Sequence, residues 1–286
     1  MKILLTNYLL DSLGGTESWI YTVASYLHLN GHEVTIYSPN LGWFGLTYLS
    51  FAKLVHVPPR EKFDLIISNH NSCFEEVKDN PARKILNCHS AFLEVENFIE
   101  GADEYVSISK EIRRIQKQRG FDSKVIMNPI DFDRFTFHPS KGLKKVLHFS
   151  KERNPASSVI KDVCEELGLE FSIIEVPQFE TEEIIKNYDL VIGIGRCLME
   201  SLAMGKNVIS GDFRSWMSDF QGGGMITEEN YEDLKFSNFS GRHRPLTFSK
   251  EVLKNEILKF DSNRNLREKL KKDCDVKLVV KKYLNG

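Results

Sequence analysis

The residues of this chain best suited to bind a phosphate group lie between Asp189 and Asp212. The sequence there predicts a buried strand, Leu190 to Ile194, then a glycine turn and a helix from Arg196 to Met204. A strand that leads through a glycine turn into a helix aims free backbone N–H groups and the positive end of the helix dipole at a ligand. Glu200 lies one turn inside this helix, where its carboxylate could accept hydrogen bonds from ribose hydroxyls.

The same pattern is also typical of a structural turn that binds nothing. Strand–turn–helix units are common in α/β proteins, and Gly193 and Gly195 lack the third glycine of the dinucleotide fingerprint. Ligands do bind preferentially at the carboxyl ends of parallel strands. On the local pattern alone, a phosphate site and a purely structural turn both stay open.

The composition is that of an ordinary globular protein. The 286 residues include 41% hydrophobic and 27% charged residues, and the net charge of −2 gives no overall attraction to nucleic acid or membranes. The five cysteines include no Cys-x-x-Cys pair, which favours reduced thiols over disulfides or a zinc site. We find no apolar run of signal-peptide length and none near the roughly 20 residues that span a bilayer. We therefore expect a cytoplasmic protein.

Strands and helices alternate along the chain. The first strand, Lys2 to Thr6, leads through Gly14 and Gly15 into a helix that Thr16 could cap. Further strands are predicted at 33–38, 64–69, 84–88, 104–108, 125–127, 145–149, 171–176, 190–194 and 207–210. Further helices are predicted at 110–119 with Ser109 as cap, 156–167, 182–186, 196–204, 228–234, 250–260, 263–272 and 273–284. This alternation predicts an α/β fold with parallel sheets and helices on both faces.

The alternation is interrupted once, by a polar stretch that contains Pro129, Pro139 and Gly142. We therefore expect two successive α/β domains, with a first domain at 1–135, a second at 136–272 and a final helical segment at 273–286. Gly222 to Gly224 is predicted to be a flexible turn. A cleft between two such domains is a favoured place for a small-molecule site.

Five motifs in this order resemble the GT-B-fold glycosyltransferases, close to the retaining enzymes of glycosyltransferase family four. GGTE is similar to the glycine-rich turn after the first strand, and DLIISNH and KILNCH resemble the two strands that end in histidine. YVSISKEIRRIQKQRGF with KVIMNPIDFDRF is similar to the signature before the linker, and DLVIGIGRCLMESLAMGKNVI to the nucleotide-binding helix. GGGMITEENYEDLKFSNFSGR resembles the variant branch in which a Gly-Arg pair opens that helix.

The resemblance implies two Rossmann-like domains that face each other across a cleft. The N-terminal domain, 1–135, would lie on the acceptor side, and the C-terminal domain, 136–272, would bind the nucleotide sugar. The segment 273–286 carries an apolar stripe and would cross back to the N-terminal domain.

The resemblance also assigns roles to single residues. Glu200 matches the family glutamate that holds the ribose, and His89 matches the histidine that stabilises charge at the reacting centre, which makes it the candidate catalytic residue. Glu17 and His70 are expected on the acceptor side. A solvated helix glutamate and histidines bonded to the backbone are the structural alternatives. The other residues expected to bind the donor are Gly14, Gly15, Lys151, Arg153, Gly195 and Arg196.

Two positions depart from the family pattern. Ile192 stands where the family has the glutamate that contacts the transferred sugar. Ser157 stands where a second basic residue would pair with the diphosphate. Arg153 or Arg196 could supply the missing charge, although an arginine at a helix start is also common for structural reasons.

The function implied by the resemblance is transfer of a sugar from a nucleotide-diphosphate sugar to an acceptor, with retention of anomeric configuration. No metal and no cofactor is implied, because helix amides and basic side chains would take the role of Mg²⁺. One alternative is a binding module whose site holds nucleotide or glycan without turnover. Another is a nucleotide-sugar epimerase or hydrolase on the same fold.

The acceptor stays open between a glycan, a lipid-linked molecule and other compounds, with nucleic acid the less favoured choice. The basic helix from Lys110 to Arg119 could contact an anionic membrane surface or a polyanionic acceptor. A solvated helix face is the favoured explanation of the same charges. Peripheral membrane contact is therefore a secondary expectation.

Overall fold

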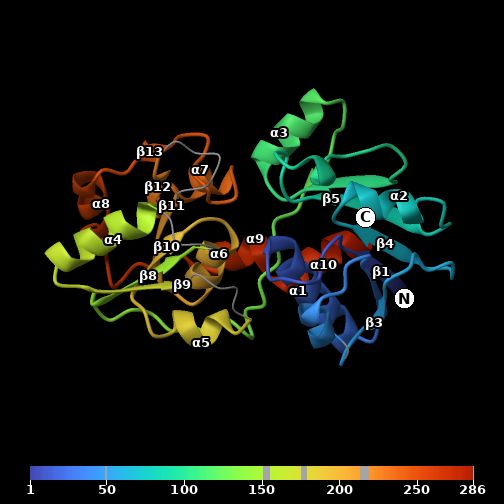
Figure 1. Ribbon diagram of the computed structural model, residues 1–286, viewed down its shortest axis with the longest axis horizontal. Helices are drawn as coiled ribbons and strands as arrows, with labels where there is room; N and C mark the ends of the chain where they lie inside the picture. The colour runs from blue at the N-terminus through green and yellow to red at the C-terminus, as the bar shows by residue number, and fades with distance from the viewer. Residues whose placement is uncertain (49, 151–154, 175–178, 213–218, 286) are drawn as a thin grey trace. The chain divides into compact units, whose positions relative to one another are not determined.

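The computed structural model describes residues 1–48, 50–150, 155–174, 179–212 and 219–285. The chain divides into two units, each built around its own β-sheet (Figure 1). Unit 1 contains Met1–Pro129 and Val276–Gly286, and unit 2 contains Ile130–Asp275. The chain thus passes from unit 1 to unit 2 six residues earlier than the expected limit at 135, and its last helix belongs to unit 1.

Unit 1 contains a parallel seven-stranded sheet in the order β3-β2-β1-β4-β5-β6-β7. The strands are β1 (Lys2–Thr6), β2 (Glu33–Tyr37), β3 (Lys53–Val55), β4 (Leu65–Ser68), β5 (Arg83–Cys88), β6 (Glu104–Ser107) and β7 (Lys124–Val125). The helices are α1 (Gly15–Leu29), α2 (Asn71–Val77), α3 (Lys110–Gln118) and α10 (Val276–Asn285), with short 3₁₀ turns η1 (Trp43–Tyr48) and η2 (Glu94–Glu96). The strand order reverses between β1 and β4, and ligands bind preferentially at the carboxyl ends of such neighbours.

Unit 2 contains a six-stranded sheet in the order β13-β12-β11-β10-β8-β9. The strands are β8 (Lys145–Phe149), β9 (Glu170–Ile174), β10 (Leu190–Gly193), β11 (Asn207–Asp212), β12 (Gln221–Met225) and β13 (Leu246–Thr247). The helices are α4 (Pro155–Glu166), α5 (Thr181–Ile185), α6 (Arg196–Ala203), α7 (Tyr231–Lys235), α8 (Lys250–Ile257) and α9 (Arg267–Cys274). The first four strands pair in parallel, β12 and β13 pair antiparallel, and the order reverses between β8 and β10.

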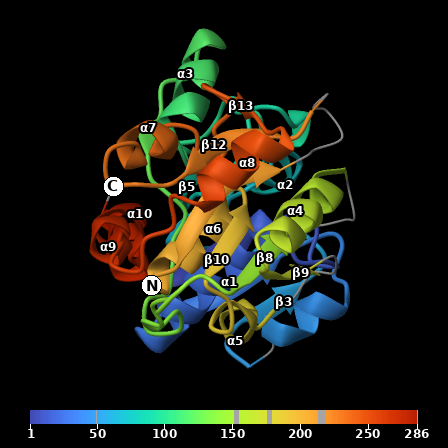
Figure 2. The ribbon, with the colours of Figure 1, turned by 90° about the vertical axis from the view of Figure 1, so that its left-hand side faces the viewer.

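Both sheets are built from nearly continuous apolar strands, as expected for parallel strands that are covered on both faces. In unit 2, α4 and α8 lie side by side over the sheet (Figure 2), and Ile160 and Leu253 pack into one cluster with Leu190. Helix α6 packs on β10 and β11 and against α9. Within the described ranges, no helix is both long and apolar enough to cross a membrane.

Most predicted elements are confirmed, including the basic helix α3, in which the Ser109 side chain accepts a hydrogen bond from the Ile112 N–H. Two local predictions are wrong. Helix α1 begins at Gly15 with Gly14 as its N-cap, so Thr16 lies inside the first turn and does not cap it.

The second error concerns Gly222 to Gly224, which form the middle of strand β12 and not a flexible turn. A Cβ atom on Gly222 would lie 2.1 Å from the Ser210 carbonyl oxygen, and one on Gly223 would lie 2.2 Å from Leu234. The glycines are therefore required because neighbouring atoms approach the strand closely.

We expect Gly222→Ala to lower the free energy of unfolding by about 3 kcal/mol, because the added methyl group collides with backbone that cannot move aside. Gly142→Ala is the matched control in unit 2, since a Cβ there meets nothing within 4 Å and should change stability by less than about 0.5 kcal/mol. Urea unfolding of both variants measures the difference. Equal stability of the two variants would contradict the packing described for β12.

Candidate functional site

The predicted site residues fall into two groups, one in each unit, and each group is described separately. In unit 2, strand β10 leads through Gly195 into α6. Gly195 has φ of +67°, a conformation that residues with a side chain rarely adopt. At Gly193, a Cβ atom would lie 2.8 Å from the Cys197 sulfur and 3.1 Å from the Phe149 carbonyl oxygen. The turn that leads from β10 into α6 therefore depends on both glycines.

Arg196 and Glu200 form a buried ion pair along α6. Arg196 Nε donates to Glu200 Oε1 at 2.8 Å, and Thr181 Oγ1 donates to Glu200 Oε2 at 3.0 Å. Burial lowers the pKa of the Arg196 guanidinium, and the Glu200 carboxylate opposes that shift. Glu200 is thus not a solvated glutamate. Its orientation is set by two protein donors, and each carboxylate oxygen retains capacity for a further donor.

The carboxyl end of α6 is held by Arg267 of α9. Its guanidinium donates to the carbonyl oxygens of Ala203, Phe135 (2.6 Å) and Phe132 (3.0 Å). These bonds satisfy a helix-terminal carbonyl that has no partner within the helix. Because the helix is anchored at this end and by the glycine turn at the other, its first turn has a defined position at the end of β10.

The two residues that depart from the pattern of the resembled family, Ile192 and Ser157, are both buried. Ile192 is completely buried in the apolar cluster of unit 2, where an unpaired carboxylate would be costly. Ser157 is buried in α4 and its Oγ lies 3.3 Å from His148 Nδ1. Lys151 and Arg153 lie outside the described residues.

Asn238 is a further candidate, and the sequence pattern does not indicate it. Asn238 and Phe239 both have positive φ, 54° and 57°, and such strained backbone is often found at functional sites. The Asn238 amide lies against the turn, since its Nδ2 would be 3.6 Å from a Cβ on Gly195. Its Oδ1 is buried and has no hydrogen-bond partner among the described residues. In the sequence, Asn238 lies between Ser237 and Phe239 in a stretch of serine and phenylalanine that matches no ligand-binding pattern.

In unit 1, the carboxyl ends of three neighbouring strands are joined by a buried chain of asparagines. Asn7 follows β1, Asn69 follows β4 and Asn87 lies in β5. Asn69 Nδ2 is 3.3 Å from Asn7 Oδ1, and Asn87 Nδ2 is 3.2 Å from Asn69 Oδ1. Asn7 Nδ2 in turn is 3.1 Å from Glu17 Oε1. His89 joins this chain, because its Nε2 lies 2.8 Å from Asn87 Nδ2 and 3.0 Å from Asn69 Oδ1.

His70 directly follows Asn69 and is buried. Its Nδ1 accepts a hydrogen bond from the Tyr8 N–H at 3.1 Å, which leaves the proton of the neutral ring on Nε2. Burial lowers the pKa of His70 to about 4. The ring is therefore neutral near pH 7 and serves as a hydrogen-bonding group, not as a cation.

Gly14 and Gly15 begin helix α1 at the carboxyl end of β1. Gly14 is extended, with φ of −131° and ψ of −168°, and no side chain caps the helix. A Cβ atom on Gly15 would meet nothing within 4 Å. The backbone at Gly15 thus does not demand glycine on steric grounds, and the open space beside it could admit a ligand.

Glu96 is a second candidate that the sequence did not indicate. It lies in η2, is only 6% exposed, and has a buried Oε2 without a hydrogen-bond partner among the described residues. Burial raises the pKa of Glu96 to about 7; hydrogen bonds from the backbone of Ser90 and His89 oppose this, and the charge of Glu17 adds to it. A carboxyl that titrates near neutral pH beside His89 has the property expected of a proton-transfer group.

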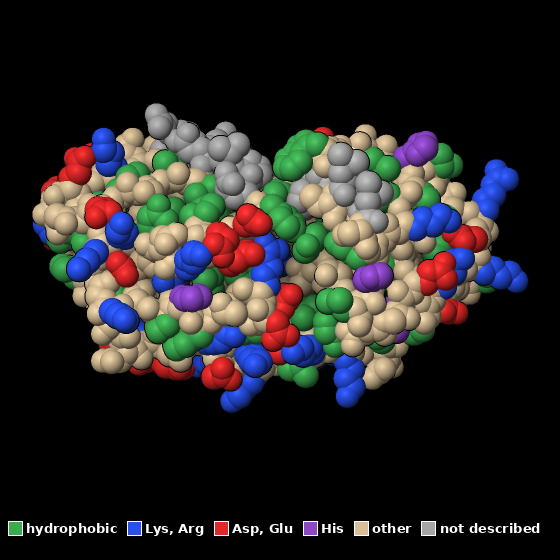
Figure 3. Space-filling model, turned by 90° about the horizontal axis from the view of Figure 1, so that it is seen from below, with side chains coloured by type: hydrophobic (Ala, Val, Ile, Leu, Met, Phe, Trp, Pro, Cys, Tyr) green, Lys and Arg blue, Asp and Glu red, His purple; other side chains and the backbone are tan. Residues whose placement is uncertain are grey.

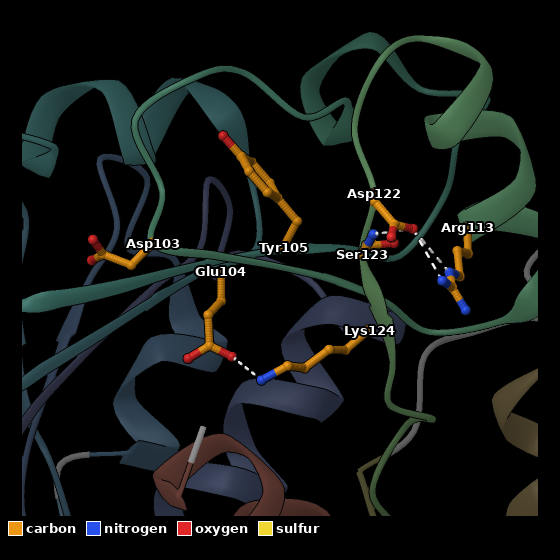
Figure 4. A pocket seen from close by; sticks show the side chains of 7 residues that line it. All are labelled: Asp103, Glu104, Tyr105, Arg113, Asp122, Ser123 and Lys124. Atoms are coloured by element: carbon orange, nitrogen blue, oxygen red, sulfur yellow. Dashed lines mark hydrogen bonds and ion pairs between the residues drawn. The ribbon is translucent and has the colours of Figure 1, made fainter.

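A hollow of about 380 Å³ in unit 1 lies at the opposite edge of the sheet, at the start of β6 and β7 (Figure 4). Its charged side chains pair with each other: Lys124 with Glu104 at 2.6 Å, and Arg113 with Asp122 at 3.1 Å. These pairs offer little unsatisfied charge to a ligand.

In the part of the chain that the structure describes, no group of three or more His, Cys, Asp or Glu side chains is placed to hold a metal ion.

The sequence matches no protein-family model and none of the curated proteins. Similar solved structures include HepE of Anabaena in complex with UDP and glucose, with 14% identity, a TM-score of 0.61, and 99% of this chain and 98% of that chain covered. A glycosyltransferase from Rickettsia africae has 15% identity and a TM-score of 0.62, with 99% and 96% covered. An alpha-glucosyltransferase in complex with UDP and a 13-mer DNA has 14% identity and a TM-score of 0.58, with 100% and 98% covered. The likeness confirms the predicted α/β GT-B fold with two Rossmann-like units.

We expect Glu96→Gln to abolish the fall in the free energy of unfolding that the wild type shows as the pH rises toward 7. The folded pKa of about 7 exceeds the ordinary value of 4.5, so the folded protein keeps a proton that the unfolded chain releases. Stability is therefore lost as the pH rises from about 4.5 to about 7. The variant should gain stability over the wild type by up to about 3 kcal/mol between pH 4.5 and pH 8.

Urea unfolding of both proteins across this range measures the gain. His70 acts in the opposite direction, because its lowered pKa costs stability as the pH falls from 6.5 to about 4, but it is present in both proteins and cancels in the difference. Glu94→Gln, at an exposed position of the same turn, is the matched control. A stability difference that does not change with pH would show that Glu96 is ionised in the folded protein.

Proposed function

We propose that this protein is a glycosyltransferase that moves a sugar from a nucleoside-diphosphate sugar to an acceptor, with retained anomeric configuration and without a metal ion. The observation that carries the proposal is the glycine turn from β10 into α6, with Glu200 held beside it by Arg196 and Thr181. A helix start of this kind suits a diphosphate, and an oriented carboxylate suits a ribose. The GT-B fold supports the same assignment.

In this proposal the donor binds to unit 2. The first N–H groups of α6 stabilise the diphosphate as it departs, with Lys151 and Arg153 as further cations. Arg196 adds positive charge at the helix start and at the same time orients Glu200. The structures of HepE and of the alpha-glucosyltransferase contain UDP, which makes a uridine nucleotide the first donor to test.

The proposed acceptor-side and catalytic groups are in unit 1. His89 stabilises charge at the reacting centre, and its ring is held by the asparagine chain. Gly15, which Gly14 precedes as the N-cap, leaves open space at the start of α1. Glu17 lies in the first turn of α1, and His70 lies just beyond the end of β4. Each group is at a carboxyl end of the parallel sheet, where ligands of such folds bind.

The identity of the acceptor is a further part of the proposal. A glycan or lipid-linked acceptor is favoured. On the face shown in Figure 3, lysine and arginine side chains are interspersed with aspartate and glutamate, without a continuous basic surface. The alpha-glucosyltransferase structure contains DNA, so nucleic acid stays among the acceptors to test. Helix α3 carries exposed basic side chains, Lys110 and Lys117 among them, that suit peripheral contact with an anionic membrane.

One observation favours a second candidate function, a nucleotide- or glycan-binding protein without turnover. Ile192 occupies the position of the family glutamate that contacts the transferred sugar, and it is fully buried. A site without that carboxylate could hold a nucleotide and fail to orient a sugar. Turnover measurements separate the two functions.

We expect Glu200→Gln to weaken UDP binding about 10- to 100-fold, because a charge-assisted hydrogen bond to the ribose becomes a neutral one. Glutamine retains a side chain of the same size in the buried site. Glu256→Gln is the matched control, since Glu256 is an equally buried glutamate of unit 2 that binds the Met225 N–H. Calorimetric titration with UDP measures both affinities. Equal affinity in the two variants would remove Glu200 from the proposed donor site.

We further expect sugar transfer or donor hydrolysis with at least one nucleoside-diphosphate sugar, and we expect it to persist in EDTA. His89→Gln should lower turnover by 100-fold or more while UDP affinity changes little, since His89 acts on the reacting centre. Product configuration, read by proton NMR, tests retention. Nucleotide binding without turnover on any donor would favour the binding protein, and loss of activity in EDTA would contradict the metal-free mechanism.

A further inference from the structure

In the asparagine chain of unit 1, the side-chain amides all donate their hydrogen bonds in the same direction along the chain. The carboxylate of Glu17 at one end sets this direction. Glu17 offers a carboxylate, which accepts hydrogen bonds, so Asn7 must turn its Nδ2 toward it. Asn7 Oδ1 then faces Asn69 Nδ2, and Asn69 Oδ1 faces Asn87 Nδ2. The amide of Asn87 is left with its Oδ1 pointing away from the chain, where Tyr283 donates its hydroxyl proton at 3.3 Å.

Tyr283 lies in α10, the final helix, and is only 1% exposed. Burial raises the pKa of its hydroxyl, so the group stays protonated and remains a donor. Its ring meets the edge of Trp19 at 5.6 Å between centroids and 83° between planes. His89 contacts the same indole at 5.8 Å and 87°. Trp19 thus fixes both rings, while Asn87 connects their polar atoms.

His89 Nε2 faces a donor and an acceptor of this chain. The shorter contact, 2.8 Å, is to Asn87 Nδ2, which can donate to Nε2 only when the neutral ring carries its proton on Nδ1. When the ring becomes charged, Nε2–H can donate to Asn69 Oδ1 at 3.0 Å. Nε2 therefore has a partner in both charge states, but in the charged ring the Nε2–H would face the Asn87 NH2 group, so this 2.8 Å contact would have to lengthen.

We propose that Tyr283 is a positioning residue of the reaction: its hydroxyl fixes the Asn87 amide, and the amide fixes the proton of the neutral His89 ring on Nδ1. The inference rests on the proposed catalytic role of His89, and its structural part can be tested without activity. Without the Tyr283 hydroxyl, Asn87 Oδ1 would be a buried acceptor that lacks this donor. The amide could then turn over, with loss of its hydrogen bond to Asn69 Oδ1, and offer its oxygen to the ring, which would draw the proton to Nε2.

The test is ¹⁵N NMR of the imidazole rings in the full-length protein, with the His89 signals assigned from His89→Gln. The wild type should show a protonated Nδ1 in the neutral ring, and Tyr283→Phe should show a mixture of the two tautomers. Tyr105→Phe is the control, because it removes a partly buried tyrosine hydroxyl elsewhere in unit 1, bonded to the Ile99 carbonyl oxygen, and should leave the His89 signals unchanged. A wild-type ring protonated at Nε2, or identical signals in Tyr283→Phe and the wild type, would overturn the inference.

Asn87→Asp provides a second test that does not depend on the folding of Tyr283→Phe. A carboxylate at position 87 accepts from both Tyr283 and His89, so the ring proton should move to Nε2 and the pKa of His89 should rise by at least one unit, a tenfold change in the proton dissociation constant. A ring that keeps its proton on Nδ1 in this variant would overturn the inference.

Kinetics separate this inference from the proposed function. Tyr283→Phe should lower kcat about two- to tenfold with little change in KM and should shift the pH profile, as expected from loss of one neutral hydrogen bond behind the catalytic group. Wild-type protein that shows the expected tautomer but turns over no donor would refute the glycosyltransferase and leave the hydrogen-bond chain intact. Active enzyme whose His89 tautomer ignores Tyr283 would refute the positioning role alone.

Discussion

Polar side chains that are buried at the carboxyl ends of parallel strands must find hydrogen-bond partners, and both candidate sites are arranged around this constraint. In unit 1 the partners are amides, which link Asn7, Asn69 and Asn87 across three strands. In unit 2 they are charges, since Arg196 and Glu200 satisfy each other along one helix. A partly satisfied network would be more costly than an apolar core. The side chains that could act on a ligand are therefore those whose neighbours already hold them in one orientation.

The two hydrogen-bond networks differ in whether their side chains can adapt to a change in charge. The ion pair of unit 2 holds one orientation, because each of the two buried charges is opposed by the other. The amide chain of unit 1 carries no cation and ends on the carboxylate of Glu17. Amides can serve as donors and acceptors, so a proton can move at His89 without leaving a bare charge in the interior. Under the proposed function, the ion pair would hold the donor and the amide chain would orient the ring at the reacting centre.

Much of this fold could be predicted from sequence, because buried parallel strands are continuous apolar runs. Lys2–Thr6 and Lys145–Phe149 have the predicted limits, and the cap at Ser109 follows from its side chain. The errors have a different origin. A run of glycines commonly marks a turn, whereas at Gly222 glycine is needed because the Ser210 backbone approaches the strand closely. Close approaches between segments far apart in sequence leave no local pattern.

The candidate site was predictable to a similar extent. The turn at Gly195 is confirmed as the start of α6, while the roles of Glu200 and His89 stay predictions. Glu96 could not be found from sequence, because its raised pKa comes from burial and not from its neighbours along the chain. The asparagine chain, by contrast, is visible in the sequence pattern. Asn7, Asn69 and Asn87 each stand at the end of an apolar run, and the parallel sheet brings such positions together.

The division of unit 1 between the two ends of the chain affects its synthesis on the ribosome. Unit 2 is continuous in sequence and can close around its own core while translation continues. The core of unit 1 lacks Val276, Val279 and Tyr283 until α10 has emerged from the ribosome. Trp19 therefore cannot contact Tyr283 until the whole of unit 2 has been synthesised. Arrest of translation before α10 would thus leave a folded second unit attached to an unfinished first one, a natural target for chaperones and proteases.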